Sequence, residues 1–221
     1  MNEHEHEPIP GLPARLPEGE TILWQGAPCW KSLARRAFHV GQIGVYFSVL
    51  LAWSISAAHA DGTRIADAVM SALRVLPLAF LAVMILGLLA WLTSRTTLYT
   101  ITNRRIVIRF GIALPMTWNV PFSMIDAAGM KAYSDRTGDL SVALKAGQRI
   151  SYLVLWPHVR PWHLAHAEPT LRGIPDAASV AAILGRALST AASQPVAVAA
   201  QLPVPAGVTQ AGVPHPAATA A

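Results

Sequence analysis

Three histidines in one short segment are the first candidates for chemistry in this sequence. His158, His163 and His166 follow one another around Pro157 and Pro161. Histidines can bind zinc, but prolines break helices and strands, and His163 and His166 have neither a defined geometry nor a carboxylate as third ligand. We therefore predict no metal site. We interpret the segment as a loop that packs on a folded domain or rests at a membrane interface.

The sequence holds no pattern typical of an enzyme. It contains no serine or cysteine nucleophile motif and no glycine-rich phosphate loop. Asp135 and Asp139 share one turn, and we expect both to bond to local backbone as turn formers. The single cysteine, Cys29, excludes an intramolecular disulfide and any multi-cysteine metal site. We predict a protein that is not an enzyme and holds no cofactor.

Cations dominate the second half of the chain. Between residues 92 and 193, eleven Lys or Arg face five Asp or Glu. Arg104, Arg105 and Arg109 allow two interpretations: they bind anionic lipid or an acidic partner, or they fix membrane topology and solvate an exposed face. No DNA- or RNA-binding signature accompanies the charge, so we predict no nucleic-acid partner.

Two uncharged segments indicate a membrane protein. The chain is 53% hydrophobic with a mean hydropathy of +0.40. Residues 38–58 and 75–92 are each long enough to cross a bilayer as a helix. We predict a transmembrane hairpin over residues 38–92, preceded by an interfacial amphipathic segment over residues 21–37.

Positive charge predicts the orientation of the hairpin. Lys31, Arg35 and Arg36 precede it and four arginines follow it, whereas the arginines of the connecting loop are balanced by aspartates. Both termini of this multi-pass membrane protein should therefore be cytoplasmic. An alternative is a twin-arginine signal, in which Arg35 and Arg36 precede an apolar run that ends in a small-residue cleavage site, residues 58–60.

A small antiparallel β domain is predicted over residues 93–193. Alternation of apolar and polar residues over 96–111 indicates a β-hairpin with its turn at Asn103 and Arg104. Further β-favouring runs occupy residues 116–122, 125–133, 139–144 and 150–155. An amphipathic helix begins after Pro175 and Asp176, and its apolar stripe should cap the barrel. The fold class is α+β: a two-helix transmembrane hairpin, then an antiparallel barrel or sandwich with a C-terminal helix.

The two ends of the chain have the composition of mobile segments. We predict a mobile acidic N-terminus over residues 1–20, in which His4 and His6 would bind a metal only weakly. Residues 194–221 form an uncharged alanine- and proline-rich tail that we expect to be disordered.

Several blocks resemble a known family. Residues 16–20, 23–26 and 28, and the Tyr99 to Arg105 block with Gly111, resemble bacterial membrane-anchored PH-like proteins. Residues 30–39, 111–115 and 155–162 are similar to the photosynthetic complex assembly family of purple bacteria. This resemblance implies a PH-like domain and a role as assembly factor for the reaction-centre and light-harvesting core complex in the bacterial inner (intracytoplasmic) membrane. A general membrane-anchored PH-like module that binds anionic lipid or peptide is the alternative.

The resemblance also suggests partners and a surface. The expected partners are reaction-centre and light-harvesting core subunits and membrane lipids, with a homo-oligomer as a further option. Docking would use small residues along the first span, Gly41, Gly44, Ser48 and Ala52. The candidate partner- or lipid-binding residues are Arg104, Arg105, Arg109, Trp156, Pro157, His158, Arg160, Pro161 and Trp162.

His39 is a weak candidate for a pigment ligand. A histidine at membrane depth can ligate the magnesium of bacteriochlorophyll, and light-harvesting polypeptides carry alanine four residues before that ligand. Here that position is Arg35. We therefore interpret His39 as a polar histidine at headgroup level.

Overall fold

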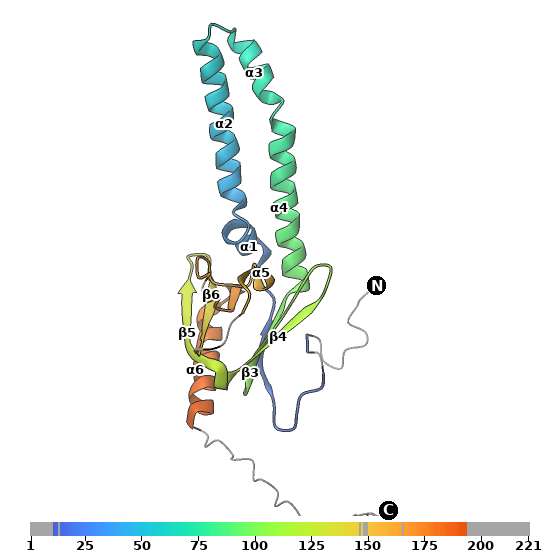
Figure 1. Ribbon diagram of the computed structural model, residues 1–221, viewed down its shortest axis with the longest axis vertical. Helices are drawn as coiled ribbons and strands as arrows, with labels where there is room; N and C mark the ends of the chain where they lie inside the picture. Colours follow the sequence, from blue (N-terminus) through green and yellow to red (C-terminus); the bar gives the residue numbers. More distant parts are fainter. Residues whose placement is uncertain (1–10, 13, 146, 148–149, 165, 194–221) are drawn as a thin grey trace, which may run out of the picture.

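The computed structural model describes residues 11–193 except 13, 146, 148, 149 and 165 (Figure 1). Its elements form two long helices on one side and a β domain on the other. The predictions for residues 1–10, which include His4 and His6, and for the tail over 194–221 lie outside the described residues.

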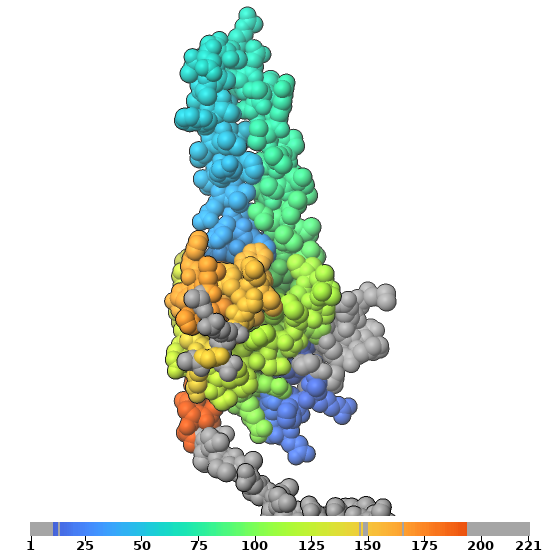
Figure 2. Space-filling model, viewed as in Figure 1, coloured from blue at the N-terminus to red at the C-terminus, as the bar shows by residue number. Residues whose placement is uncertain are grey.

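A helical hairpin projects from one end of the β domain (Figure 1). It consists of α2 (Val40–Ala60), the short α3 (Ile65–Leu73) and α4 (Leu76–Thr96). By length and composition, α2 and the α3–α4 run could each cross a membrane. The helices lie side by side (Figure 2) and expose large apolar side chains, such as Trp53 and Phe80. The positions agree with the predicted spans, whereas α3 was not predicted.

The first sheet has four antiparallel strands in the order β1-β2-β3-β4. They are β1 (Ile22–Gly26), β2 (Leu98–Thr102), β3 (Arg105–Phe110) and β4 (Met116–Pro121). Tyr99 pairs with Ile108, and Ile101 with Ile106, and all four side chains are fully buried. The predicted hairpin and its two-residue turn are thus confirmed. Gly111 ends β3 with φ +120°, where an added Cβ would collide with the carbonyl of Leu114.

The second sheet has three antiparallel strands, and the helix α6 covers one of its faces. The strands are β5 (Ile125–Ala132), which follows a 3₁₀ turn η1 (Phe122–Met124), β6 (Thr137–Leu144) and β7 (Thr170–Pro175). The predicted capping helix is α6 (Ala177–Ser193), whose Val180, Leu184 and Ala187 are buried in a core shared with both sheets. The α+β class with antiparallel sheets and a C-terminal helix is confirmed.

Residues 150–155 differ from the sequence prediction. The expected strand is a short helix, α5 (Tyr152–Leu155), and β7 takes the place beside β6. Since β6 is paired with β5 on one side and β7 on the other, it has no edge left for another strand. Pro157 then ends any regular structure.

The N-terminal region is also more ordered than predicted. Within the segment expected to be mobile, Leu12 is 1% exposed, and the buried Glu20 accepts two hydrogen bonds from the Arg105 guanidinium. The segment 21–37, expected to be one interfacial run, contains instead β1 and the helix α1 (Trp30–Arg36). Residues 22–26 form a strand because they pair with β2, which lies far away in the sequence. The local pattern of apolar and polar residues does not show such long-range pairing.

Candidate functional site

The base of the helical hairpin joins the β domain through a small apolar core. Helix α1 packs on α4, and Leu33, Ala37, Phe38 and Ala90 are buried together. His39 has φ +53°, a left-handed conformation that separates α1 from α2. The chain therefore turns at His39, and the hairpin is seated on α1 rather than hanging from a free linker.

A fully buried histidine lies next to this junction. The Tyr99 hydroxyl lies 2.7 Å from Nδ1 of His158, and Thr97 Oγ1 lies 3.2 Å from its Nε2. The same Tyr99 oxygen accepts a hydrogen bond from the backbone N–H of Arg172. We assign the Tyr99 hydroxyl as donor to an unprotonated Nδ1 of His158, so that the Nε2–H of the neutral imidazole donates to Oγ1 of Thr97. This assignment satisfies both ring nitrogens.

Burial keeps this pair uncharged. Desolvation, with a smaller effect of the nearby Arg172 charge, lowers the pKa of His158 to about 3. Desolvation also raises the pKa of Tyr99 far above its usual value. At neutral pH the imidazole and the phenol are both neutral. They are therefore suited to holding structure rather than to exchanging protons.

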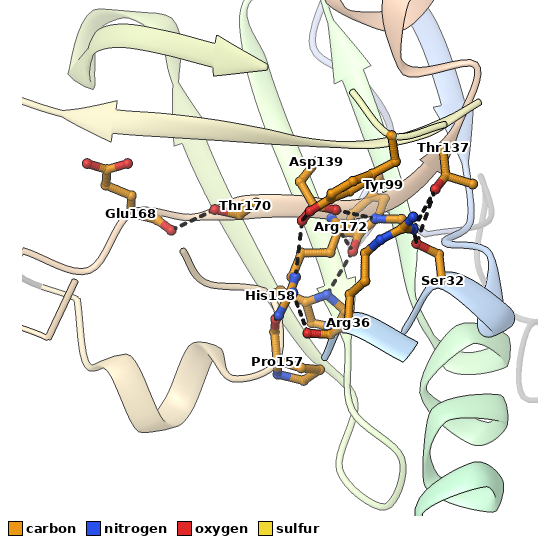
Figure 3. Close-up of polar contacts among 12 residues, drawn as sticks. Ser32, Arg36, Tyr99, Thr137, Asp139, Pro157, His158, Glu168, Thr170 and Arg172 are labelled. Carbon is orange, nitrogen blue, oxygen red and sulfur yellow. Dashed lines mark hydrogen bonds and ion pairs between the residues drawn. The ribbon is translucent and has the colours of Figure 1, made fainter. Parts of the chain in front are cut away.

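Arg172 of β7 links the loop, the sheet and α1 (Figure 3). Its guanidinium donates to the carbonyl oxygens of Pro157 and Arg36, and its Nε lies 3.5 Å from the Asp139 carboxylate. The side chain is 7% exposed. A buried guanidinium needs such partners, since an unpaired charge inside a protein is costly.

Asp139 is not the turn former that we expected. It lies within β6, accepts hydrogen bonds from the Gly173 N–H and the Tyr133 hydroxyl, and faces Arg172. Burial, and next the bond to Asp139, raise the pKa of Tyr133 to about 12. Asp135 does form a turn as predicted, because it accepts from the backbone and hydroxyl of Thr137, and these bonds lower its pKa.

Arg36, the last residue of α1, extends the network from α1 to the turn between β5 and β6 (Figure 3). Its guanidinium donates to Ser32 and Thr137, pairs with Asp135 at 3.0 Å and stacks 3.6 Å from the ring centre of Tyr133. These contacts join α1 to the β5–β6 turn. Together with Arg172 they fix the direction in which α2 leaves the domain.

A groove with a volume of about 780 Å³ opens beside this network. Its floor is the face of the β5–β6–β7 sheet that carries Gly129, Tyr133 and Ser141. Its other walls are the junction of α1 with α2 and the loop over residues 160–163. In Figure 2 the segment 150–175, in yellow-orange and orange, lies directly below the blue base of the hairpin. The lining has five Lys or Arg but only one carboxylate, that of Asp139.

Comparison with known families identifies this architecture. A family model described as "Bacterial PH domain" (bPH_2) matches residues 37–188. The chain belongs to the bacterial PH domain family. The chain is also 40% identical over 205 residues to a Rhodobacter capsulatus protein described as "Uncharacterized 23.7 kDa protein in puhA 5'region". That match covers 90% of this chain and 95% of the relative. No solved structure matches.

Within this bacterial PH domain, residues 156–162, which we call the Trp-Pro loop, have both buried and exposed side chains. Pro157 and His158 are buried, and they anchor the loop. Trp156 makes an edge-to-face contact with Phe38 at 5.3 Å, and Trp162 is 91% exposed. The remaining two, Pro161 and Arg160, are exposed, and Arg160 pairs with Glu168 at 2.9 Å.

The three predicted arginines do not form one patch beside the hairpin. Arg104 and Arg105 lie at the turn between β2 and β3, and since β2 starts directly after α4, this turn is at the far end of the strand. Arg105 is held by Glu20. Arg109 lies at the other end of β3, opposite Leu98. Sequence reasoning placed them together because they are close in the chain.

His39 lines the groove at the foot of α2, below the apolar part of the hairpin. Among the described residues, no three His, Cys, Asp or Glu side chains gather as a metal site. Sequence reasoning missed Arg36, Tyr99 and Arg172. The only available signal was the alternation that put Tyr99 on the apolar face of β2.

Proposed function

We propose that this chain is a non-enzymatic assembly factor for the photosynthetic reaction-centre and light-harvesting core complex. Its helical hairpin is the membrane anchor, and the PH-like domain and the Trp-Pro loop contact nascent subunits at the bilayer surface. The observation that carries the proposal is the Rhodobacter capsulatus relative, whose gene lies in the 5' region of the photosynthesis gene puhA. The resemblance of residues 155–162 to assembly proteins supports it as well.

The hairpin supports the proposal through its exposed surface. A soluble protein rarely leaves an apolar surface of this extent uncovered, and a bilayer or partner helices would cover it. The small residues at Gly41 and Gly44 leave open space, since an added Cβ would meet nothing within 4 Å. A neighbouring helix can approach closely there.

Strand pairing supports an orientation with both ends of the hairpin on one side. β1 precedes the hairpin and β2 follows it, yet they pair from Ile22 with Thr102 to Gly26 with Tyr99. We propose that this side is the cytoplasm, because Lys31, Arg35 and Arg36 flank the hairpin. A cleaved twin-arginine signal fits poorly, since cleavage after residue 60 would remove β1 and α1 from the domain.

Deletion and complementation test the assembly role. We expect a deletion strain to lose assembled core complex and photosynthetic growth, and the wild-type gene to restore both. Copurification in mild detergent should recover reaction-centre or antenna subunits with the tagged chain. Recovery should fall for Trp162→Ala and remain for Met116→Ala, which alters an exposed apolar residue at the start of β4.

The alternative, a general PH-like module that binds anionic lipid, makes the opposite prediction. It is favoured by the basic groove at the foot of α2. Wild-type photosynthetic growth of the deletion strain, with no core subunits in the purified material, would reject the assembly role and support this module.

A further inference from the structure

The groove at the foot of α2 carries charge that the fold itself does not use. Arg36 and Arg172 are fully engaged in the network described above. Arg35 and Lys131 are exposed, and within the described residues neither has a carboxylate partner. Lys131 lies 5.6 Å from the ring centre of Tyr133, which holds its amine over the groove floor. Two cations therefore remain available to an anionic ligand.

The only carboxylate in the lining, that of Asp139, lies across the strands from Lys131 but is already bonded to other donors. Asp139 directs one oxygen to the Gly173 N–H and the other to the Tyr133 hydroxyl and Arg172. Glu168 and Asp135, close by, are paired with Arg160 and Arg36. The electrostatic potential inside the groove is thus positive. The protein walls of the groove screen these charges less than bulk water would.

Along α2, away from the β domain, the groove leads into a stripe of apolar side chains. Gln42 lines the groove, and Tyr46, Val49 and Trp53 follow it at helical spacing on the same side of the helix. These three side chains are 60%, 63% and 73% exposed. A ligand with its anionic end in the groove would meet a continuous apolar surface directly above. A basic groove next to an apolar surface matches an amphiphile, which has both an anionic end and apolar chains. A free anion would use only the groove.

We propose that the groove binds the phosphate headgroup of an anionic phospholipid, with its acyl chains along the Tyr46–Trp53 face of α2. Arg35 and Lys131 contact the phosphate, and His39 and Gln42 border the glycerol region. Basic pockets beside transmembrane helices are a known chemical solution for anionic headgroups. The inference rests on the membrane anchoring in the proposed function, and it adds a specific lipid site on the cytoplasmic side.

Native mass spectrometry of the full chain, released from nanodiscs of phosphatidylcholine mixed with phosphatidylglycerol, tests the site. We expect the wild type to retain phosphatidylglycerol, and Arg35→Gln with Lys131→Gln to reduce that retention about tenfold or more. The matched control, Lys145→Gln with Arg186→Gln, removes one Lys and one Arg outside the groove and should retain lipid like the wild type. Equal retention by the two double variants would overturn the proposal.

Two further arms separate a lipid from a free phosphate and from misfolding. Inorganic phosphate and glycerol phosphate should leave the retained lipid in place, whereas displacement by either would identify a phosphate site without a role for the chains. Both double variants should unfold thermally like the wild type, because all four side chains are exposed. Release of the chain from membranes by alkaline carbonate would instead reject the anchoring, and growth of the deletion strain reports separately on assembly.

Discussion

The hydroxyl of Tyr99 lies 2.7 Å from Nδ1 of His158, and both side chains are completely buried. Tyr99 is in the strand that directly follows α4, and His158 is in the Trp-Pro loop. One hydrogen bond therefore joins the end of the hairpin to the loop that carries Trp156 and Trp162. Any change that breaks it should loosen the loop and the hairpin base together.

Tyr99→Phe tests this bond directly. The variant leaves the His158 ring nitrogen and the Arg172 N–H buried without a partner, and we expect a loss of about 2–4 kcal/mol in unfolding free energy. Tyr152→Phe is the matched control, since no hydrogen bond of its hydroxyl to a described residue is found, and it should change stability little. Thermal and denaturant unfolding in detergent measure both. A near-neutral Tyr99→Phe would contradict the role of this bond.

Stability should fall in mild acid because of His158. Its pKa is lowered to about 3 in the folded protein, against about 6.5 in an unfolded chain. Between pH 6.5 and pH 3, His158 is therefore protonated in the unfolded state but not in the folded state. The free energy of unfolding decreases as pH falls through this range. This group alone should cost roughly 2 kcal/mol between pH 7 and pH 5. Denaturant unfolding over this range measures the slope.

The variant His158→Gln identifies the source of that slope. Glutamine can still donate and accept hydrogen bonds but does not titrate, so the acid-induced loss should shrink even if the variant is less stable at pH 7. An unchanged slope in His158→Gln would place the effect elsewhere.

Arg172 and Asp139 should be strongly coupled. Arg172→Met leaves the Asp139 carboxylate without its cation and two carbonyls without a donor, and we expect a loss of about 3–5 kcal/mol. Asp139→Asn should also destabilise. The double variant should lose less than the sum of the two, with a coupling of about 1–3 kcal/mol in unfolding free energy. Additive losses would mean that the ion pair contributes nothing of its own.

Replacing glycine by alanine should have opposite effects on stability at Gly173 and at Gly185. Gly173 has φ +62° and accepts a hydrogen bond from Cys29, and a Cβ there would lie 3.2 Å from Ser32 of α1. Gly173→Ala should therefore destabilise the docking of α1 by about 1–2 kcal/mol. Gly185→Ala, within α6 with open space around it, should stabilise by about 0.5–1 kcal/mol. Differential scanning calorimetry of the two variants distinguishes them.

Local periodicity accounts for the parts of the fold that the sequence predicted. The β2–β3 hairpin, α6 and the two apolar helices each repeat a pattern within one segment, at period two, at 3.6, or as an uncharged run. Strands β1 and β7 depend on partners far away in the chain, and in β7 the charged Arg172 and Gly173 interrupt the apolar residues. No local pattern marks such strands.

The candidate site was predicted only in part, for a similar reason. The composition of the Trp-Pro loop drew attention to a segment that lines the groove. Its residues, however, gave no sign that His158 turns inward while Trp162 turns outward. Asp139 looked like a turn residue because a glycine and Asp135 stand near it, but the β5–β6 register places it beside Lys131 on the sheet face. Only tertiary pairing separates these roles.

The pairing of β1 with β2 has a consequence for biogenesis. Gln25 donates a hydrogen bond to Thr100, 75 positions later in the chain, and the whole hairpin lies between them. During translation the first strand therefore waits without a partner until both helices have left the ribosome. Under the membrane anchoring proposed above, a chain that inserted only one of the two helices would hold β1 and β2 on opposite sides of the bilayer. Their unpaired edges would then be open to aggregation or proteolysis. Under the same anchoring, completion of the four-stranded sheet requires that the two helices return the chain to the same side of the bilayer.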